Sequence, residues 1–553
     1  MKHMRQFNLY DEPWVAVVGM DGAHEELSLR DTLLEAPKIR SLDGELGIQD
    51  AAMLRFLLAF LYRVFEPDMD AWSDIWQAKA FPMDRVDKYV NGPLREDSWT
   101  DGSVDSVHDR LFLDADDLPF LQVAGMEPMS GHAQSPSAIM QDVRLFGMQH
   151  VGTFMTVRQE SSFSRISPGE AARWLLSTLL YDDAAQRGAM KGDPNLATSR
   201  GKPKSSVYPA LNPPASKSMV NVVGSSLFST LMLNLVPYDA EGMLISANHG
   251  VPLWEKKPLD PCSARRIPET GELERTAATS VIDEYVFPSR KIRLLFDDEG
   301  MVTGVLLGAG LRMMPPGQNV EPMLAWRSND TGKGGESIVP VSVGVSSSIW
   351  RALPAFMLKS GDNDMRPAVV RFADDLAAWP EYGVGEAERL DLSVSTVQYG
   401  TQYACISDIR TSSMQLPMAL LKSQTLCELA AECGSMADKA VGLWTAFMKR
   451  LSVALGSTDG AVSEHLKTEF IGILETDFNE WLAGMGDDHA DTERLRSQWL
   501  KTLGRRAVSQ AETLSATLPA SAFAGNDDGS GKTESYGTAY DSLIRGLRRE
   551  GML

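Results

Sequence analysis

The stretch MADKAVGLWTAFMKRL, residues 436–451, decides the structure of the C-terminal part of the chain. Its apolar residues recur at intervals of three and four, a spacing that places side chains on one face of an α-helix. These residues are Met436, Ala440, Leu443, Trp444, Phe447, Met448 and Leu451. The stretch therefore predicts an amphipathic helix whose apolar face packs against other elements.

The same spacing continues toward the C-terminus. It recurs over Leu466–Trp481 and Leu495–Leu514, and a last helix is predicted over Tyr540–Arg549 after a Gly/Ser/Asp-rich loop. Four amphipathic helices with short connections are typical of a four-helix bundle. We expect this bundle to form a domain over residues 416–553, preceded by a larger domain over residues 1–415.

The first 415 residues mix short strands with helices. Apolar alternation predicts strands, and a broad apolar face predicts a helix. The strands are Trp14–Val18, Ile292–Phe296, Val302–Leu307 and Leu390–Val397, and the helix is Gln49–Phe65. The sequence thus predicts an α+β protein, with a large irregular α/β N-terminal domain followed by a C-terminal four-helix bundle.

Composition narrows the class of protein. The chain has 553 residues, of which 43% are apolar and 23% charged, as in soluble globular proteins. Its four cysteines are scattered without a CxxC pair, which indicates a reducing compartment and argues against a cysteine-based zinc site. The N-terminus lacks the apolar core of a signal peptide, and the apolar stretch 51–65 is too short to span a bilayer. We expect a soluble cytoplasmic protein with no membrane partner, no metal and no cofactor.

Charge argues against a free-standing nucleic-acid binder, because the net charge of −21 repels phosphate. One segment departs from this average. Between residues 187 and 217 the single acid is Asp193, and the basic residues are Arg187, Lys191, Arg200, Lys202, Lys204 and Lys217. The segment is rich in Gly, Pro and Ser and follows a helix that Ser167 begins with a predicted capping box to Glu170. It is either a polyanion-binding loop or a solvated surface loop.

Two further motifs suggest enzymes, but their spacing does not fit. The stretch GNDDGSGKT, Gly525–Thr533, resembles a phosphate-binding loop, yet five residues instead of four separate its first glycine from the Gly-Lys pair. His108-Asp109 and His489 within DDHAD have no second His/Asp cluster at metal-ligand spacing. We therefore expect no enzyme activity. An NTP- or metal-dependent nucleic-acid hydrolase and a protein-only scaffold remain the alternatives.

Several passages together resemble the CasA family, the large subunit of the type I-E CRISPR Cascade complex. They include FNLYDEPWVAV, RISPGEAARWLLSTLLYDD, SRKIRLLFDDEGMVTGVLLGAG, NVEPMLAWR and VQYGTQYACISD, in consistent order over nearly the whole chain. The resemblance implies a non-catalytic subunit of an RNA-guided surveillance complex. Such a subunit scans double-stranded DNA for a protospacer-adjacent motif (PAM), helps to start strand separation and presents a landing surface for a helicase–nuclease. The partners implied are the other Cascade subunits, crRNA, target DNA and that helicase–nuclease.

The resemblance also implies DNA-binding residues after the helix that Ser167 begins. The family's glycine loop matches QRGAMKG in this chain, where Gly192 corresponds best to the key glycine and Gly188, Ala189 and Lys191 surround it. Small residues suit such a loop, because its backbone must lie against base-pair edges in the narrow minor groove.

The remaining implied positions lie farther along the chain or before this helix. Arg312 matches a basic finger that is often lysine in the family. The strand-separating wedge falls in YGTQYA, at Gln402 or Tyr403, with Ala404 beside them. A loop implied to contact crRNA and neighbouring subunits carries Phe154, Met155 and Thr156. Some family members carry a zinc-binding cysteine cluster that this sequence lacks.

Overall fold

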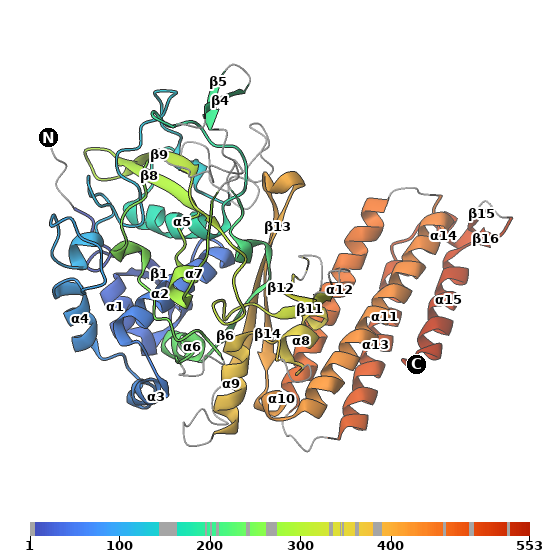
Figure 1. The fold of residues 1–553 in the computed structure, drawn as a ribbon. Helices are drawn as coiled ribbons and strands as arrows, with labels where there is room; N and C mark the ends of the chain where they lie inside the picture. Colours follow the sequence, from blue (N-terminus) through green and yellow to red (C-terminus); the bar gives the residue numbers. More distant parts are fainter. Residues whose placement is uncertain are drawn as a thin grey trace. The chain divides into compact units, whose positions relative to one another are not determined.

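The computed structural model describes most of the chain (Figure 1). The described residues are 6–142, 163–193, 196–199, 202–205, 210–238, 244–261, 274–330, 336–342, 344, 348–359, 364–379, 390–456, 460–485, 491–527 and 531–553. They form two compact units. The first comprises Met1–Val345 and Arg366–Ser412, and the second comprises Ser346–Met365 and Ser413–Leu553. Mixed helices and strands in the first unit and helices in the second confirm the predicted α+β class.

The boundary between the units lies at residues 412/413 instead of the predicted 415/416, and a second difference is larger. The second unit also contains α8 (Ile349–Met357), which the sequence analysis placed in the N-terminal domain. This helix packs on α11 (Gln424–Ala454): the indole N–H of Trp350 donates to Asp438, and Gly434 lies against the Trp350 backbone. A nine-residue helix so far from the bundle in sequence gave no periodic signal that assigns it there.

The first unit is built around α2 (Gly47–Phe65), nearly all of whose side chains are buried. The predicted helix Gln49–Phe65 is confirmed, with a start two residues earlier. The two arginines of α2 are buried as ion pairs, Arg55 with Glu321 at 2.8 Å and Arg63 with Glu255 at 2.6 Å. Helix α5 (Pro168–Tyr181) packs beside α2, and the Ser167 hydroxyl accepts from the Glu170 N–H at its start.

Small sheets surround these helices. Strands β1 (Val15–Gly19), β2 (His24–Leu27) and β3 (Ile39–Leu42) form an antiparallel sheet in the order β2-β1-β3. A second sheet has the order β14-β13-β6 and consists of β6 (Met219–Val223), β13 (Leu390–Tyr399) and β14 (Ile406–Leu416). The predicted hairpin is confirmed as β8 (Arg290–Phe296) and β9 (Val302–Ala309).

The remaining elements of the first unit are short. Its helices are α1 (Leu29–Leu34), α3 (Met69–Ala78), α4 (Met83–Asn91), α6 (Leu227–Asn234), α7 (Val281–Tyr285) and α9 (Ala368–Ala378). Three two-stranded sheets pair β4 (Leu196–Ser199) with β5 (Lys202–Ser205), β7 (Arg275–Thr276) with β10 (Arg312–Met313), and β11 (Trp326–Asp330) with β12 (Glu336–Pro340). The basic segment expected to be a loop thus contains the β4–β5 hairpin.

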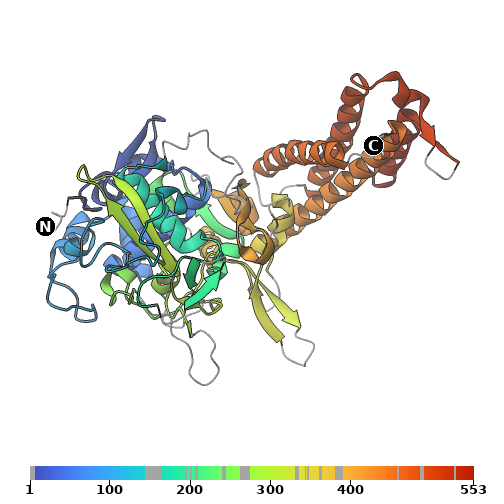
Figure 2. The same ribbon diagram turned by 90° about the horizontal axis from the view of Figure 1, so that it is seen from above.

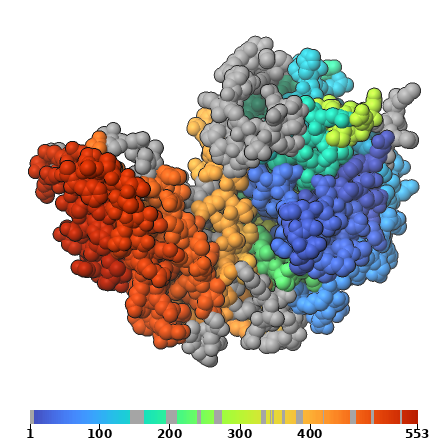
Figure 3. Space-filling view, turned by 180° about the vertical axis from the view of Figure 1, so that it is seen from behind, coloured from blue at the N-terminus to red at the C-terminus, as the bar shows by residue number. Residues whose placement is uncertain are grey.

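The second unit contains four long helices, as predicted. They are α11, α12 (Gly460–Ala483), α13 (Thr492–Ser515) and α15 (Tyr536–Arg549), and short elements α10 (Met418–Lys422), α14 (Ala520–Ala524), β15 (Asn526–Asp527) and β16 (Thr533–Glu534) flank them. Figure 3 shows the orange and red residues of this unit as one continuous body. Its core is aromatic: the Trp444 and Phe470 rings stack with centroids 4.8 Å apart, and Trp499 lies 5.3 Å from Phe478.

The last helix starts four residues earlier than predicted. Ser535 caps it and forms a reciprocal capping box with Thr538, a local signal that the apolar pattern did not include. None of the helices in the described part of the chain combines the length and apolar character needed to cross a membrane.

Candidate nucleic-acid interface

The implied glycine loop leaves α5 over a buried cluster of charges. Arg290, at the start of β8, donates from Nε to Asp182 Oδ2 at 2.6 Å and from Nη2 to the carbonyl oxygens of Asp182 and Asp183, both at 2.8 Å. Arg187 donates to the carboxylates of Asp182 and Asp183 at 2.5 and 2.9 Å. All four residues are buried. Because each charge faces an opposite charge, the cluster fixes the backbone that enters the loop.

Burial is the largest influence on the pKa of the Arg290 guanidinium. It lowers the pKa of Arg290 below the ordinary value, and the carboxylate of Asp182 opposes that shift. An arginine stays protonated even so, since its ordinary pKa is far above neutrality. Arg290 is therefore a permanent positive charge that holds two backbone carbonyls of the loop.

The second half of the loop is fixed by its backbone. Lys191 N–H donates to Glu127 O at 2.7 Å, and Met129 N–H donates to Ala189 O at 2.9 Å. Ala189 is buried, so its side chain shapes the loop from inside. Lys191 is exposed and forms a 2.8 Å surface ion pair with Glu127, whose pKa it lowers. Solvent screens such an exposed pair strongly, so Lys191 is readily released to another anion.

The two glycines of the loop differ. Gly192 is exposed and has φ +79°, a conformation that residues with a Cβ adopt only with strain. Gly188 is half-buried with an ordinary φ, and a Cβ built on it would meet no atom within 4 Å. A methyl group at residue 188 therefore fits the protein itself and changes only the surface that the loop presents.

The implied wedge residues lie at the tip of the β13–β14 hairpin. Gln402 and Tyr403 are both exposed, as is Ala404, and both have left-handed backbones with φ of +56° and +58°. A residue other than glycine in this region costs about 1–3 kcal/mol, so the surrounding structure must hold the tip in shape. The Tyr403 side chain is 55% exposed, which is unusual for so large a ring.

The structure brings the glycine loop and the hairpin tip together. The Ala184 N–H donates to the Tyr403 carbonyl at 2.7 Å, and the Tyr399 hydroxyl donates to the Tyr181 carbonyl at 2.8 Å. The Tyr399 and Tyr403 rings meet edge to face, 6.3 Å apart. Two segments implied separately by the resemblance therefore share one connected surface.

Arg312 joins this region through the backbone. It lies half-buried in β10, after Gly310 and Leu311, whose N–H groups donate to Ser289 and Pro288 at 3.0 and 2.9 Å. These two acceptors directly precede Arg290. Arg312 is thus attached to the strand whose first residue fixes the glycine loop.

Several contacts here were missed by sequence reasoning. Arg290 and Asp182 are 108 residues apart, and the sequence analysis assigned a role to neither. Ala184 carries no side-chain signal, because its contribution is a backbone N–H. Tyr399 is the first residue of the quoted YGTQYA stretch, and its hydroxyl was the one available signal. The predicted crRNA-contact residues Phe154, Met155 and Thr156 lie outside the described residues.

Two of the stretches that suggested enzymes make contacts within the fold. The Gly525–Thr533 stretch joins α14 to α15 through the β15–β16 pair, and the Asn526 amide donates to Ala454 O at 3.0 Å. His108 contacts Asp11 through Nε2 at 2.8 Å. Within the described ranges, no group of three His, Cys, Asp or Glu side chains is arranged to hold a metal ion. His489 lies outside those ranges.

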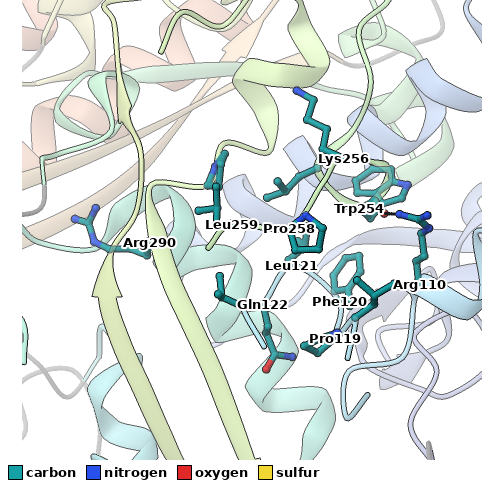
Figure 4. A pocket seen from close by; sticks show the side chains of 14 residues that line it. Arg110, Pro119, Phe120, Leu121, Gln122, Trp254, Lys256, Pro258, Leu259 and Arg290 are labelled. Atoms are coloured by element: carbon teal, nitrogen blue, oxygen red, sulfur yellow. Dashed lines mark hydrogen bonds between the residues drawn. The ribbon is translucent and has the colours of Figure 1, made fainter. Parts of the chain in front are cut away.

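A separate pocket lies in the first unit, between Phe120, Trp254 and Pro258 (Figure 4). Its cationic groups are already engaged: Arg110 donates to Trp254 O at 3.3 Å, Lys256 pairs with Asp283, and Arg290 belongs to the cluster described above. Since its polar groups serve internal contacts, we assign this pocket no ligand.

Comparisons with known proteins agree on one family. The sequence model of the family described as CRISPR-associated protein Cse1 matches residues 8–510. A CRISPR-associated protein CasA/Cse1 from Thermus thermophilus is 26% identical over 437 residues, which are 76% of this chain and 73% of the relative.

Solved structures agree with this match. Cse1 from Thermobifida fusca has a TM-score of 0.78 at 26% identity, covering 99% of this chain and 98% of that one. Cse1 from Acidimicrobium ferrooxidans has a TM-score of 0.76 at 25% identity and covers 98% of both chains. A chain of a CRISPR RNA-guided surveillance complex shares the fold, with a TM-score of 0.60 at 15% identity and coverage of 98% and 99%.

Proposed function

This chain belongs to the CRISPR-associated Cse1 (CasA) family, and from that membership and the geometry of its loops we propose that it reads the PAM in duplex target DNA as the large subunit of a type I-E Cascade complex. One observation carries the proposal: the glycine loop and the exposed hairpin tip are joined by the Ala184–Tyr403 hydrogen bond of 2.7 Å. A reader and a wedge on one rigid surface can couple motif recognition to strand separation.

Each part of the surface has a role that fits its chemistry. The Gly188–Gly192 backbone approaches base-pair edges in the minor groove, where bulky side chains do not fit. Lys191 and Arg312 bind flanking phosphates or groove edges. Gln402 or Tyr403, both exposed at the tip, inserts at the adjacent base step, where an inserted side chain unstacks the bases at a cost of a few kcal/mol.

The rest of the proposal concerns the separate roles of the protein and the guide RNA. Guide RNA pairing supplies sequence specificity, and the protein reads only the short motif. A net charge of −21 keeps the isolated subunit a weak DNA binder, so that partner subunits and crRNA place the duplex. The subunit itself is non-catalytic and acts in the cytoplasm. It recruits the helicase–nuclease once strand separation has begun.

The test is duplex binding by the complete guide-loaded complex, with and without this subunit, on targets that differ only in the flanking motif. We expect motif discrimination only with the subunit. Gly188→Ala should weaken binding of the preferred motif about 5-fold to 150-fold, because one lost base-edge contact costs about 1–3 kcal/mol.

The matched control is Gly442→Ala in α11, where an added Cβ also meets no atom within 4 Å. It should bind like the parent. If the subunit binds every flank equally, or if Gly188→Ala also binds like the parent, the chain acts as a protein-only scaffold and the proposal fails.

A further inference from the structure

Two cations lie together at the base of the β11–β12 hairpin. Lys217 follows the short turn Pro213–Ser216, and Arg327 lies on β11 opposite Val339. Their segments are joined by two hydrogen bonds, from the Ser342 hydroxyl to Ser216 O at 3.2 Å and from Val220 N–H to Met323 O at 2.9 Å. Lys217 is half-buried and Arg327 is exposed.

Neither cation has an acidic partner among the described residues. Within the part of the chain that the structure describes, neither side chain forms an ion pair or a hydrogen bond. Burial lowers the pKa of Lys217, and the nearby positive charge of Arg327 lowers it further. Repulsion between two neighbouring positive charges is relieved when an anion binds to both.

Other cations of the first unit do have acidic partners. Lys38 pairs with Glu35 at 2.6 Å, and Arg165 pairs with both Asp297 and Glu299. The chain has 74 acidic and 53 basic side chains, so most cations can find an acid. Leaving two neighbouring cations without one points to a ligand that supplies the negative charge.

We propose that Lys217 and Arg327 form a binding site for a phosphodiester of the nucleic-acid backbone. The inference rests on the proposed function and extends it to residues outside the implied PAM readers. Arginine binds phosphate through its planar fork of donors, and lysine adds a point charge. Contacts of this kind fix the register of a duplex on a protein without reading its sequence.

The position of the pair supports this role. Figure 2 shows the β11–β12 hairpin standing out from the first unit. Ala210, seven residues before Lys217, accepts at its carbonyl from Arg290 Nη1 at 3.0 Å. The same arginine fixes the glycine loop. A phosphate held at Lys217 and Arg327 is therefore linked through one buried residue to the loop that reads the motif.

The test uses Lys217→Met and Arg327→Gln, singly and together, in the guide-loaded complex. Duplex affinity is measured over a series of salt concentrations on a preferred and a non-preferred flank. Each lost phosphate contact should lower the slope of log K against log salt by about 0.9 and weaken both flanks equally. Lys38→Ala, which removes a cation already paired with an acid, should leave the slope unchanged.

A second arm distinguishes the source of the phosphate. If the phosphodiester belongs to target DNA, the slope change appears in duplex binding, whereas if it belongs to crRNA, it appears when the subunit assembles onto the guide-bearing complex. An unchanged slope in both arms overturns the proposal. Gly188→Ala measured in parallel reports separately on the proposed function, because it should alter motif discrimination whether or not this site exists.

Folding is checked on the subunit without nucleic acid. Because each substitution relieves repulsion between like charges, the thermal midpoint of either variant should equal or exceed that of the parent. A lower midpoint would show that the two cations stabilise the fold, which contradicts the geometry on which the site is based.

Discussion

The C-terminal helices and the loops around Arg290 are stabilised in opposite ways. In the helices, a continuous apolar face packs many side chains, such as Leu503 and Trp499, which are fully buried. In the loops, a few buried charges and single hydrogen bonds carry the structure, among them Arg290–Asp182 and Ala184–Tyr403. Packing spreads stability over many atoms. The buried charges of Asp182, Asp183, Arg187 and Arg290, here called the loop cluster, depend instead on each member.

The largest effect is expected from a substitution that removes one charge of the loop cluster. Asp182→Asn keeps the shape of the side chain but leaves Arg187 and Arg290 buried without their shared carboxylate. Removing one partner of a buried ion pair typically costs about 3–5 kcal/mol. We expect a loss of that size in the free energy of unfolding of the first unit, measured by denaturant titration.

Asp182→Asn should also abolish motif discrimination by the assembled complex. A stability change below about 1 kcal/mol would show that Asp182 is not the anchor of this cluster.

The next effect concerns the helices. Leu503→Ala removes a fully buried side chain of α13 and should cost about 2–5 kcal/mol in the second unit. Because neighbouring side chains share the packing, the loop cluster should keep its structure. Duplex discrimination measured below the unfolding transition should therefore remain normal. Loss of discrimination with a folded first unit would contradict this separation.

A smaller effect depends on pH. Asp50, near the start of α2, accepts from Gly44 N–H, and burial raises its pKa to about 6. An acid with a raised pKa in the folded state keeps its proton while the unfolded state loses it, so stability falls as pH rises from about 4 to about 6. The slope is at most about 1.4 kcal/mol per pH unit.

Asp50→Asn should remove that part of the slope, since an amide does not titrate in this range and its oxygen can still accept from Gly44. Unfolding of the variant and the parent is compared at several pH values. Identical slopes would show that Asp50 titrates normally.

The smallest expected effect is at Lys532, which is exposed in the loop that resembles a phosphate-binding motif. Lys532→Ala should change stability by less than about 0.5 kcal/mol and leave duplex binding unaltered. If this substitution abolished nucleotide binding or hydrolysis by the purified protein, the hydrolase alternative would replace the non-catalytic one.

The same contrast explains how far the sequence predicts the structure. Periodic patterns predicted α2, the β8–β9 hairpin and the long C-terminal helices, because each pattern reflects contacts repeated along one element. The sequence analysis placed α8 in the N-terminal domain, whereas in the structure it belongs to the second unit. Its place depends on the contacts of Trp350 with Asp438 and Gly434, which no local pattern reveals.

The candidate site could be reached only in part. Family resemblance pointed to Gly192 and Tyr403, but the hydrogen bond from Ala184 joins backbone atoms that no residue type reveals. The cluster at Arg290 joins residues 108 apart. Local patterns cannot report such distant pairs, and an arginine at the start of a strand is ordinarily interpreted as exposed.

The measurement that tests the central claim most directly is a double-mutant cycle between the glycine loop and the hairpin tip. Duplex affinity of the guide-loaded complex is measured for the parent, Gly188→Ala, Tyr403→Ala and the double variant. If the two loops form one DNA-reading surface, the losses should be non-additive by at least about 0.5 kcal/mol. Additive losses would mean that the loops contact DNA independently, which contradicts the account.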